Sequence, residues 1–449
     1  MKGLILIYCV TVIASIAALR KPMIGLLVYV GFAVLRPEGL FGWAGDLGGI
    51  SLIVGIATLI GWILTGCGSF RVGSRGRAIA LSLVAFFVWS ALSASQALNT
   101  EIAYATLITM AKFVMPFLIG VTLMETEADS RAMLWVIVLA QGYVAFEMNF
   151  NYVVRDYNLA GDGFSGMDNN CFGVSLVSTV GPAIALGLGS KKWYAQLASG
   201  IAAALIVHTT LLTFSRGAML GLIVVGVTAF VIMPKRPKYL AAIAVALLLT
   251  VRFTGPQLYA RYASAFAEGE ERDGSAESRL ALWSDCLKIA TSQPLLGVGP
   301  ANFPVVAANY GWTEGKQAHS VWMQTMAENG FPGLAALMMF FGLTVVKLWP
   351  IARLKPTDEN RYRMTVASGI VMSIVGFAVA GQFVSLAGLE IPYYIAMIGV
   401  VLLKDLPTPA LSAVAKPTGP PVTKPASHQP LRPAGAWTGG AGHNPLPRH

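Results

Sequence analysis

The feature that most constrains the fold of this chain is a series of long apolar runs separated by short polar segments. A helix needs roughly 17–25 mostly apolar residues to cross the ~30 Å hydrocarbon core of a membrane. About 13 runs come close to that length, and neighbouring runs could merge, so about 12 spans fit equally well. The runs lie at residues 3–19, 23–38, 51–68, 78–94, 102–124, 132–150, 171–189, 194–213, 217–234, 239–253, 333–349, 364–384 and 387–403.

The composition agrees with this pattern. Of the 449 residues, 55% are hydrophobic and 12% are charged, and the mean hydropathy is +0.64. Soluble domains carry about 25% charged residues. We therefore predict an all-α, polytopic transmembrane helical bundle with a helical loop domain on its outer side. The first apolar run is closely followed by further apolar runs and shows no small-residue cleavage site, so we expect no cleaved signal peptide.

The basic residues lie in short clusters between the runs. A net charge of +10 could suggest nucleic acid as a partner. Cytoplasmic loops retain Lys and Arg, however, and all the clusters fall on one side when the runs alternate in direction. We therefore expect no nucleic-acid partner and assign this side to the cytoplasm. The clusters are Arg20 and Lys21; Arg71, Arg75 and Arg77; Lys191 and Lys192; Lys235, Arg236 and Lys238; and Arg353, Lys355, Arg361 and Arg363.

These assignments divide the chain into five parts. Residues 1–190 are N-terminal transmembrane helices, and residues 191–253 are transmembrane helices that carry a Ser-Arg-Gly turn. Residues 254–332 form a large exterior loop with a histidine-bearing helix, and residues 333–404 form the C-terminal transmembrane helices. Residues 405–449 are rich in Pro, Gly and Ala, and we expect a disordered cytoplasmic tail there.

Arg216 is the first candidate for a functional residue, in the turn from Thr213 to Gly217. It interrupts apolar sequence on both sides, where a buried guanidinium costs at least ~2.5–3.5 kcal/mol. One explanation is an arginine that extends from a helix end to the membrane surface. The other is an anion site, because a permanent positive charge suits a diphosphate and Gly217 allows close approach.

Arg279 lies in the exterior loop, where Ser278 could cap a helix that runs to about Ser292 and ends before Pro294. A cation in the first turn of a helix is mildly unfavourable with the helix dipole, so a charged ligand would explain it. A solvated surface arginine is the alternative. The glycines after Pro294 do not form a phosphate-binding P-loop, because the lysine and hydroxyl that should follow are absent.

His319 closes the longest polar stretch of the chain and precedes an amphipathic helix that we predict to end at Gly330. Ser320, Gln324 and Glu328 have i, i+4 spacing, so one face of this helix is polar and needs an aqueous or protein-lined cavity. A lone histidine is usually a satisfied polar residue. Where a loop meets the membrane, its imidazole can also accept a proton near neutral pH.

Asp168, Asn169 and Asn170 precede a span on the exterior side. They could line a sugar-contacting surface, or Asp168 or Asn169 could cap the following helix. Lys112 and Glu147 are charges inside predicted spans, but no spacing pairs them.

Together these segments resemble the O-antigen ligase family of membrane glycosyltransferases, which also includes O-antigen polymerases and bacterial O-linking oligosaccharyltransferases. The order and spacing of the motifs over residues 200–345 make the resemblance specific. Ser320 departs mildly from the family, where asparagine more often follows the histidine. The matching residues are Ser215-Arg216-Gly217; Arg279 with Trp283; Pro294-Leu295-Leu296-Gly297-Val298-Gly299 with Asn302-Phe303; Ala318-His319-Ser320; and Glu328-Asn329-Gly330.

The N-terminal half is also similar to O-glycosylation ligases found beside exosortase systems. The residues that suggest this finer resemblance are Lys21-Pro22, Arg36-Pro37 and Asp168-Asn169-Asn170.

The resemblance implies transfer of a glycan from an undecaprenyl-diphosphate carrier to a glycan, lipid A core or protein acceptor. The site would face the periplasm from the bacterial inner membrane. Arg216 and Arg279 would bind the diphosphate and stabilise the leaving charge, and His319 would accept the acceptor's proton. No cofactor and no metal would be needed, since two guanidinium groups replace a divalent cation. We predict further contacts to the diphosphate or glycan from Asp168, Asn169, Asn170, Gln324 and Glu328.

Three alternatives remain open at this point. A ligase and a polymerase of this family share a donor and differ in acceptor; the N-terminal resemblance and the moderate exterior loop favour a ligase. A secondary transporter would place polar residues and broken helices near the bilayer midplane in two related halves, whereas here they collect at one face. A purely structural membrane scaffold would tolerate loss of Arg216.

Overall fold

The computed structural model of the chain describes residues 2–41, 49–70, 72–233, 274–385 and 389–404. Within these ranges every regular element is a helix, which confirms the predicted all-α fold. The helices are α1 (Lys2–Ala18), α2 (Pro22–Leu35), α3 (Pro37–Phe41), α4 (Ile50–Leu64), α5 (Ser74–Ala94), α6 (Thr100–Leu123), α7 (Glu127–Arg155), α8 (Leu159–Asp162), α9 (Asn169–Gly189), α10 (Trp193–Leu212), α11 (Arg216–Ile232), α14 (Gly274–Ser292), α15 (Phe303–Val306), η3 (Ala307–Tyr310), α16 (Val321–Ala352), α17 (Arg361–Ala380), η4 (Gly381–Phe383) and α18 (Ile391–Lys404).

Seven of these helices are long and apolar enough to cross a membrane, and five shorter apolar helices accompany them. Each overlaps one of the apolar runs predicted from the sequence. The run predicted at 239–253 and the tail predicted at 405–449 lie outside the described residues, as does the part of the exterior loop before residue 274.

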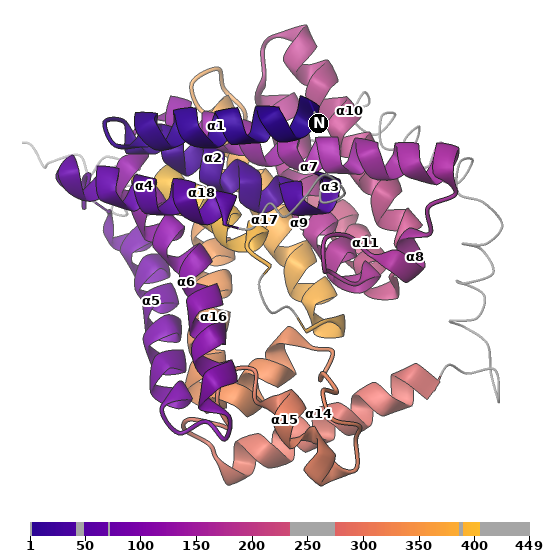
Figure 1. Ribbon diagram of the computed structural model, residues 1–449. Coiled ribbons are helices and arrows are strands. Elements are labelled where there is room, and N and C mark those ends of the chain that lie inside the picture. Colours follow the sequence, from indigo (N-terminus) through magenta and orange to yellow (C-terminus); the bar gives the residue numbers. More distant parts are fainter. Residues whose placement is uncertain (1, 42–48, 71, 234–273, 386–388, 405–449) are drawn as a thin grey trace, which may run out of the picture. The chain divides into compact units, whose positions relative to one another are not determined.

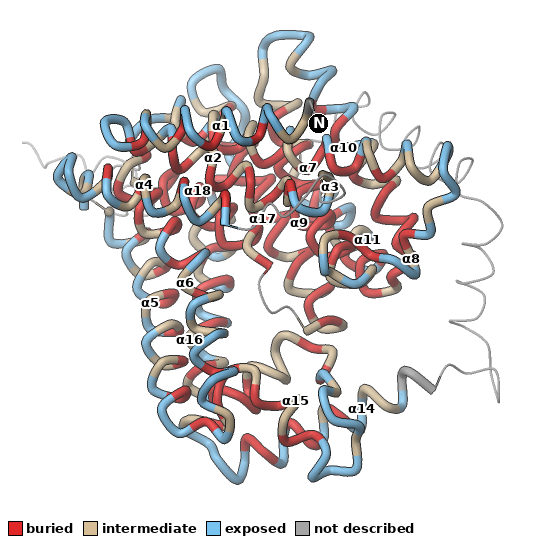
Figure 2. The backbone as a smooth tube through the Cα atoms, viewed as in Figure 1, coloured by how far each residue is buried: buried red, intermediate tan, exposed pale blue. Residues whose placement is uncertain are grey.

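Several helices expose apolar side chains on their outer faces, as expected of a protein surrounded by lipid. Ile13 of α1 and Leu64 of α4 are 67% and 71% exposed. A soluble monomer rarely exposes contiguous apolar surface. Buried residues instead concentrate on α9, α17 and α18 (Figure 2).

Glycines bring α9, α11 and α17 close together. A Cβ added to Gly181 of α9 would overlap the carbonyl oxygen of Gly369 in α17. Similarly, a Cβ on Gly221 of α11 would lie 3.2 Å from the Gly376 oxygen. Small residues allow such backbone approach between membrane helices. This packing positions the first turn of α11, which carries Arg216, beside α9 and α17.

The predicted basic clusters within the described residues gather at one end of the bundle, as alternating spans require. Arg71 and the cluster Lys235, Arg236 and Lys238 lie outside the described residues. At this end an ion pair joins Arg363 Nε to Glu127 Oε1 at 3.1 Å, and Gly61 packs closely against the backbone of Ala18. Hydrogen bonds there run from Arg361 Nε to Leu188 O (3.1 Å), from Lys404 Nζ to Met124 O (3.0 Å) and from Trp62 Nε1 to Thr122 Oγ1 (2.8 Å).

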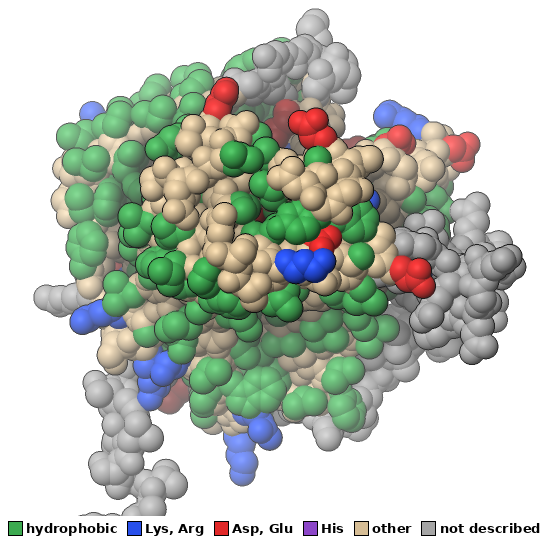
Figure 3. Space-filling model, turned by 90° about the horizontal axis from the view of Figure 1, so that it is seen from below, with side chains coloured by type: hydrophobic (Ala, Val, Ile, Leu, Met, Phe, Trp, Pro, Cys, Tyr) green, Lys and Arg blue, Asp and Glu red, His purple; other side chains and the backbone are tan. Residues whose placement is uncertain are grey.

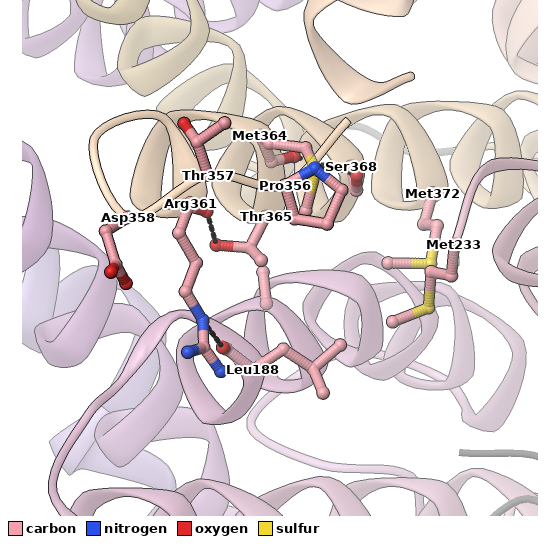
Figure 4. A pocket seen from close by; sticks show the side chains of 11 residues that line it. Leu188, Met233, Pro356, Thr357, Asp358, Arg361, Met364, Thr365, Ser368 and Met372 are labelled. Carbon is pink, nitrogen blue, oxygen red and sulfur yellow. Dashed lines mark hydrogen bonds between the residues drawn. The ribbon is translucent and has the colours of Figure 1, made fainter. Parts of the chain in front are cut away.

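A cavity of about 360 Å³ lies at the same end, between α9, α17 and the end of α11 (Figure 4). Arg361 and Thr365 line it, and Thr365 Oγ1 donates to Arg361 O at 2.8 Å. Asp168, Asn169 and Arg216 lie at the opposite ends of α9 and α11, and none of the predicted site residues lines this cavity, so it is separate from the candidate site.

The opposite end carries a layer formed by α14, α15 and η3, and α5 and α6 reach down to it (Figure 1). The layer has its own hydrophobic cluster, in which Leu282, Cys286, Phe303 and Ala318 have no exposed surface. Seen from this side, hydrophobic side chains are interspersed with only scattered charged ones (Figure 3).

The helix that carries Arg279 begins earlier than predicted. α14 is already helical at Gly274, so the prediction that Ser278 caps it is wrong. The physical reason is that Glu277 lies in the first turn, where a negative charge is favourable with the helix dipole. Arg279 consequently lies in the second turn.

Candidate active site

Gly330 breaks α16 in two. Its φ of 65° and ψ of −176° are not helical and suit only glycine. The next residue, Phe331, donates its N–H outside the helix, to Pro294 O at 2.9 Å. The predicted break at Gly330 is confirmed, but the helix resumes at once and continues to Ala352.

The break leaves carbonyl groups that the loop after α14 satisfies. In a regular helix Glu328 O would accept from residue 332, but Pro332 has no N–H. Instead Glu328 O accepts from Gly299 N at 2.9 Å, and Ala327 O accepts from Val298 N at 3.0 Å. The family-like segments around residues 294–299 and 328–330 are therefore hydrogen-bonded to each other.

Gln324 and Glu328 form the polar face predicted for the first part of α16. Glu328 is only 7% exposed, and its Oε1 accepts from Gln324 Nε2 at 2.8 Å and Phe303 N at 3.4 Å. Gln324 Oε1 accepts from Ala318 N at 3.3 Å and Ser385 Oγ at 2.5 Å. Both side chains hold neighbouring segments together, and their contact with a glycan stays a prediction.

His319 lies just before α16, between two residues that fix its backbone. The carbonyl of Ala318 accepts from Trp283 Nε1 of α14 at 3.1 Å, and Ser320 Oγ caps α16. His319 itself has a φ of +50°, a left-handed conformation that is uncommon for residues other than glycine. Such strain recurs at functional sites.

Charged groups from separate segments act on the half-buried His319. Burial lowers the pKa of His319 below its usual 6.5, and the positive charges of Arg279 and Lys316 lower it further. The negative charge of Asp168 acts in the opposite direction. The imidazole is therefore biased toward its neutral form, which can accept a proton.

Arg279 is brought to His319 by α14. Arg279 and Trp283 are four residues apart and share a face of this helix. Because Trp283 bonds to the carbonyl of Ala318, the same face of α14 carries Arg279 toward His319.

Asp168 is the N-cap of α9, as one of the two predicted alternatives proposed. Its carboxylate accepts from Cys171 N at 2.7 Å while remaining close enough to influence His319. Asn169 Nδ2 donates to Thr213 O at 2.9 Å, and Asn170 Nδ2 donates to Asn169 Oδ1 at 3.2 Å. This group thus ties α9 to the turn that precedes Arg216.

Arg216 is the first residue of α11, behind the cap residue Ser215, whose Oγ accepts from Ala218 N at 3.3 Å. Gly217 packs on Phe383, because an added Cβ would lie 2.8 Å from the Phe383 Cβ. Two residues further, Ser385 bonds to Gln324. The Ser-Arg-Gly turn thus joins the same contact network as the loop before α16.

The structure adds residues that the sequence did not single out. Lys316 influences His319 from three positions upstream, and Ser385, in the segment after η4, donates to Gln324 of α16. Lys112, for which the sequence showed no partner by spacing, lies within electrostatic reach of Glu390. Tyr394 Oη and Tyr29 Oη both donate to the backbone carbonyl of Lys112. Of these contacts, only the one between Lys316 and His319 had a signal in the sequence, because the two residues are three positions apart.

Comparison with known proteins gives two matches. Residues 201–338 match a family model described as O-antigen ligase, and residues 1–155 match a model described as a family of unknown function. No curated protein matches the chain. The first match contains Arg216, Arg279 and His319, so the predicted resemblance to the O-antigen ligase family is confirmed over this segment, in a multi-pass membrane protein.

Proposed function

We propose that the chain transfers a glycan from an undecaprenyl-diphosphate carrier to an acceptor at the periplasmic face of the bacterial inner membrane, without a metal. The observation that carries the proposal is the electrostatic interaction of His319 with Arg279 and Asp168, three groups from separate segments. The O-antigen ligase match, which contains Arg279 and His319, supports glycosyl transfer as the reaction class.

In the proposed reaction, neutral His319 accepts the proton of the acceptor hydroxyl while its oxygen attacks the anomeric carbon of the donor. The bond from that carbon to the diphosphate oxygen breaks, and its electron pair leaves with undecaprenyl diphosphate. Arg216 and Arg279 bind the diphosphate and stabilise the charge that develops on it.

Asp168 has a separate role in this scheme. After proton transfer His319 is a cation, and the nearby carboxylate of Asp168 stabilises it. Arg279 does the opposite and favours the neutral imidazole before the reaction. Arg279 therefore favours the state before proton transfer, and Asp168 favours the state after it.

Asn169, Asn170 and the polar face of Gln324 and Glu328 are proposed to border the glycan. The contacts of Gln324 and Glu328 within the protein support a role in shaping the site. Among family activities we favour a ligase; surface glycans with shortened repeats on a capped acceptor, in a strain lacking the chain, would indicate a polymerase instead.

A secondary transporter is less well supported. Its broken helices would meet near the bilayer midplane. Here the break at Gly330 pairs with the loop after Pro294, beside the exterior layer of short helices.

The test is His319→Ala in the native host, with Gln317→Ala as control because Gln317 is exposed and two residues away. We expect His319→Ala to abolish transfer to the surface glycan and to cause the undecaprenyl-linked donor to accumulate. Gln317→Ala should resemble the wild type. Normal surface glycan in the His319→Ala strain would refute the proposal, and failed uptake or export of a solute would point to a transporter.

A further inference from the structure

The last turns of α5 lie against the loop after α14. Trp89 and Ser93 are spaced i and i+4, so they share one face of the helix, and Gln96 follows in the turn after α5. Each donates a side-chain hydrogen bond to a successive carbonyl of the loop. The bonds run from Trp89 Nε1 to Leu295 O (3.0 Å), from Ser93 Oγ to Leu296 O (2.5 Å) and from Gln96 Nε2 to Gly297 O (3.5 Å).

The same residues of α5 also reach the break in α16. Trp89 Nε1 donates to Asn329 O at 3.1 Å, and Ser93 Oγ lies 2.8 Å from Glu328 O. Glu328 O is the carbonyl that Pro332 leaves without its helical donor. Ser93 Oγ thus contacts a carbonyl of the loop, Leu296 O, and a carbonyl of α16, Glu328 O, where the two segments are hydrogen-bonded to each other.

Asn302 extends this contact to the turn after α5. It has no exposed surface, and its Oδ1 accepts from Asn99 N at 2.7 Å. Its Nδ2 donates to Asn99 O at 3.1 Å and to Pro300 O at 3.0 Å. Buried polar groups satisfied in this way fix the segment that carries them.

We propose that Trp89 and Ser93 are positioning residues for the reaction: they hold the loop at 294–299 and the broken α16 in the one arrangement that presents His319. The link runs from Ser93 to Glu328, whose side chain bonds Gln324, and from Gln324 to the backbone of Ala318. This inference rests on the proposed function. It gives a role to part of the segment that matches a family of unknown function.

Ser90 provides a matched control on the same helix. Like Ser93 it has no exposed surface, but its Oγ has no hydrogen-bond partner among the described residues. Ser90→Ala and Ser93→Ala therefore remove the same atom from equally buried positions. Only the second removes bonds to the loop and to α16.

The first measurement is hydrogen–deuterium exchange on the full-length protein in detergent. We expect Ser93→Ala to speed exchange at least fivefold in peptides covering 294–303 and 327–333, and Ser90→Ala to leave it unchanged. Trp89→Phe, which removes only the indole donor and a little volume, should act like Ser93→Ala. Unchanged exchange in both Ser93→Ala and Trp89→Phe, or equal increases in Ser90→Ala and Ser93→Ala, would overturn the inference.

The second measurement is glycan transfer in the native host, beside affinity of the purified protein for undecaprenyl diphosphate. We expect Ser93→Ala to lower the transfer rate roughly 5- to 30-fold at unchanged affinity, since Arg216 and Arg279 are untouched. The acid limb of its pH profile should move to higher pH, because added water relieves the burial that lowers the pKa of His319. Wild-type transfer and pH profile in Ser93→Ala would overturn the positioning role.

The two proposals fail separately. If His319→Ala leaves transfer intact, the proposed function is wrong, and the positioning role for that reaction falls with it. If His319→Ala abolishes transfer while Ser93→Ala behaves like Ser90→Ala, only the positioning role is wrong.

Discussion

Replacing Gly330 with alanine should destabilise the protein by about 2–4 kcal/mol. The φ of 65° with ψ of −176° is a conformation that costs other residues about 1–3 kcal/mol. A Cβ at this position would also lie 2.6 Å from Pro294 O and overlap Leu295 O, both backbone atoms that a side-chain rotation cannot move. Displacing this segment breaks the bond from Phe331 N to Pro294 O, at about 1 kcal/mol.

Gly342 is the matched control, because it lies in the same helix and no atom lies within 4 Å of a Cβ added there. Gly342→Ala should be neutral or stabilise by about 0.5–1 kcal/mol, the usual gain of alanine over glycine inside a helix. Thermal unfolding in one detergent at one scan rate compares the variants. An apparent Tm of Gly330→Ala equal to or above that of Gly342→Ala would refute the geometry of the break.

Three other predictions follow. Lys316→Gln should raise the pKa of His319 by removing a positive neighbour, so the acid limb of the pH–transfer profile should move to higher pH. Asp168→Asn, which keeps the helix cap, should lower this pKa and move the acid limb to lower pH. A shift of both limbs in the same direction would contradict the opposite effects of Lys316 and Asp168 on His319. Asn302→Ala should cost about 2–3 kcal/mol in thermal unfolding through its lost bonds to Asn99, whereas a loss below ~0.5 kcal/mol would contradict that contact. EDTA should leave transfer unchanged in washed membranes, and restoration of a lost activity by Mg²⁺ would contradict a metal-independent reaction.

The spans could be predicted because the bilayer requires long apolar runs, which are visible in one dimension. The break at Gly330 was also visible, since glycine and proline adjoin there. The span predicted at 333–349 follows the break directly, and what could not be foreseen is where the freed carbonyls find their donors. The carbonyls freed by the break are satisfied by residues 298 and 299, and no local pattern reports that pairing.

The candidate site, too, was predictable from the sequence only in part. Short motifs identified Arg216, Arg279 and His319 as candidates, and the structure brings Arg279 and Asp168 within electrostatic reach of His319. The role of Ser93 could not be identified from the sequence, because one serine in an apolar run resembles any other, including Ser90. Its partners are more than 200 positions away, at separations of 203 and 235 residues. Such contacts exist only in the folded chain.

The start of α14 was misjudged for a related reason. Ser278 resembled a cap, yet Glu277 before it suits the first turn of a helix that has already begun. Local capping preference was the weaker of two competing signals.

The most direct test of the central claim is the affinity of the purified protein for undecaprenyl diphosphate. Arg216→Gln and Arg279→Gln should each weaken binding by about 10-fold or more, since hydrogen bonds to charged groups contribute about 1.5–3 kcal/mol. Lys355→Gln, exposed at the opposite end, should not. Unchanged affinity in both arginine variants, or an equal loss in Lys355→Gln, would contradict a diphosphate site formed by the two arginines.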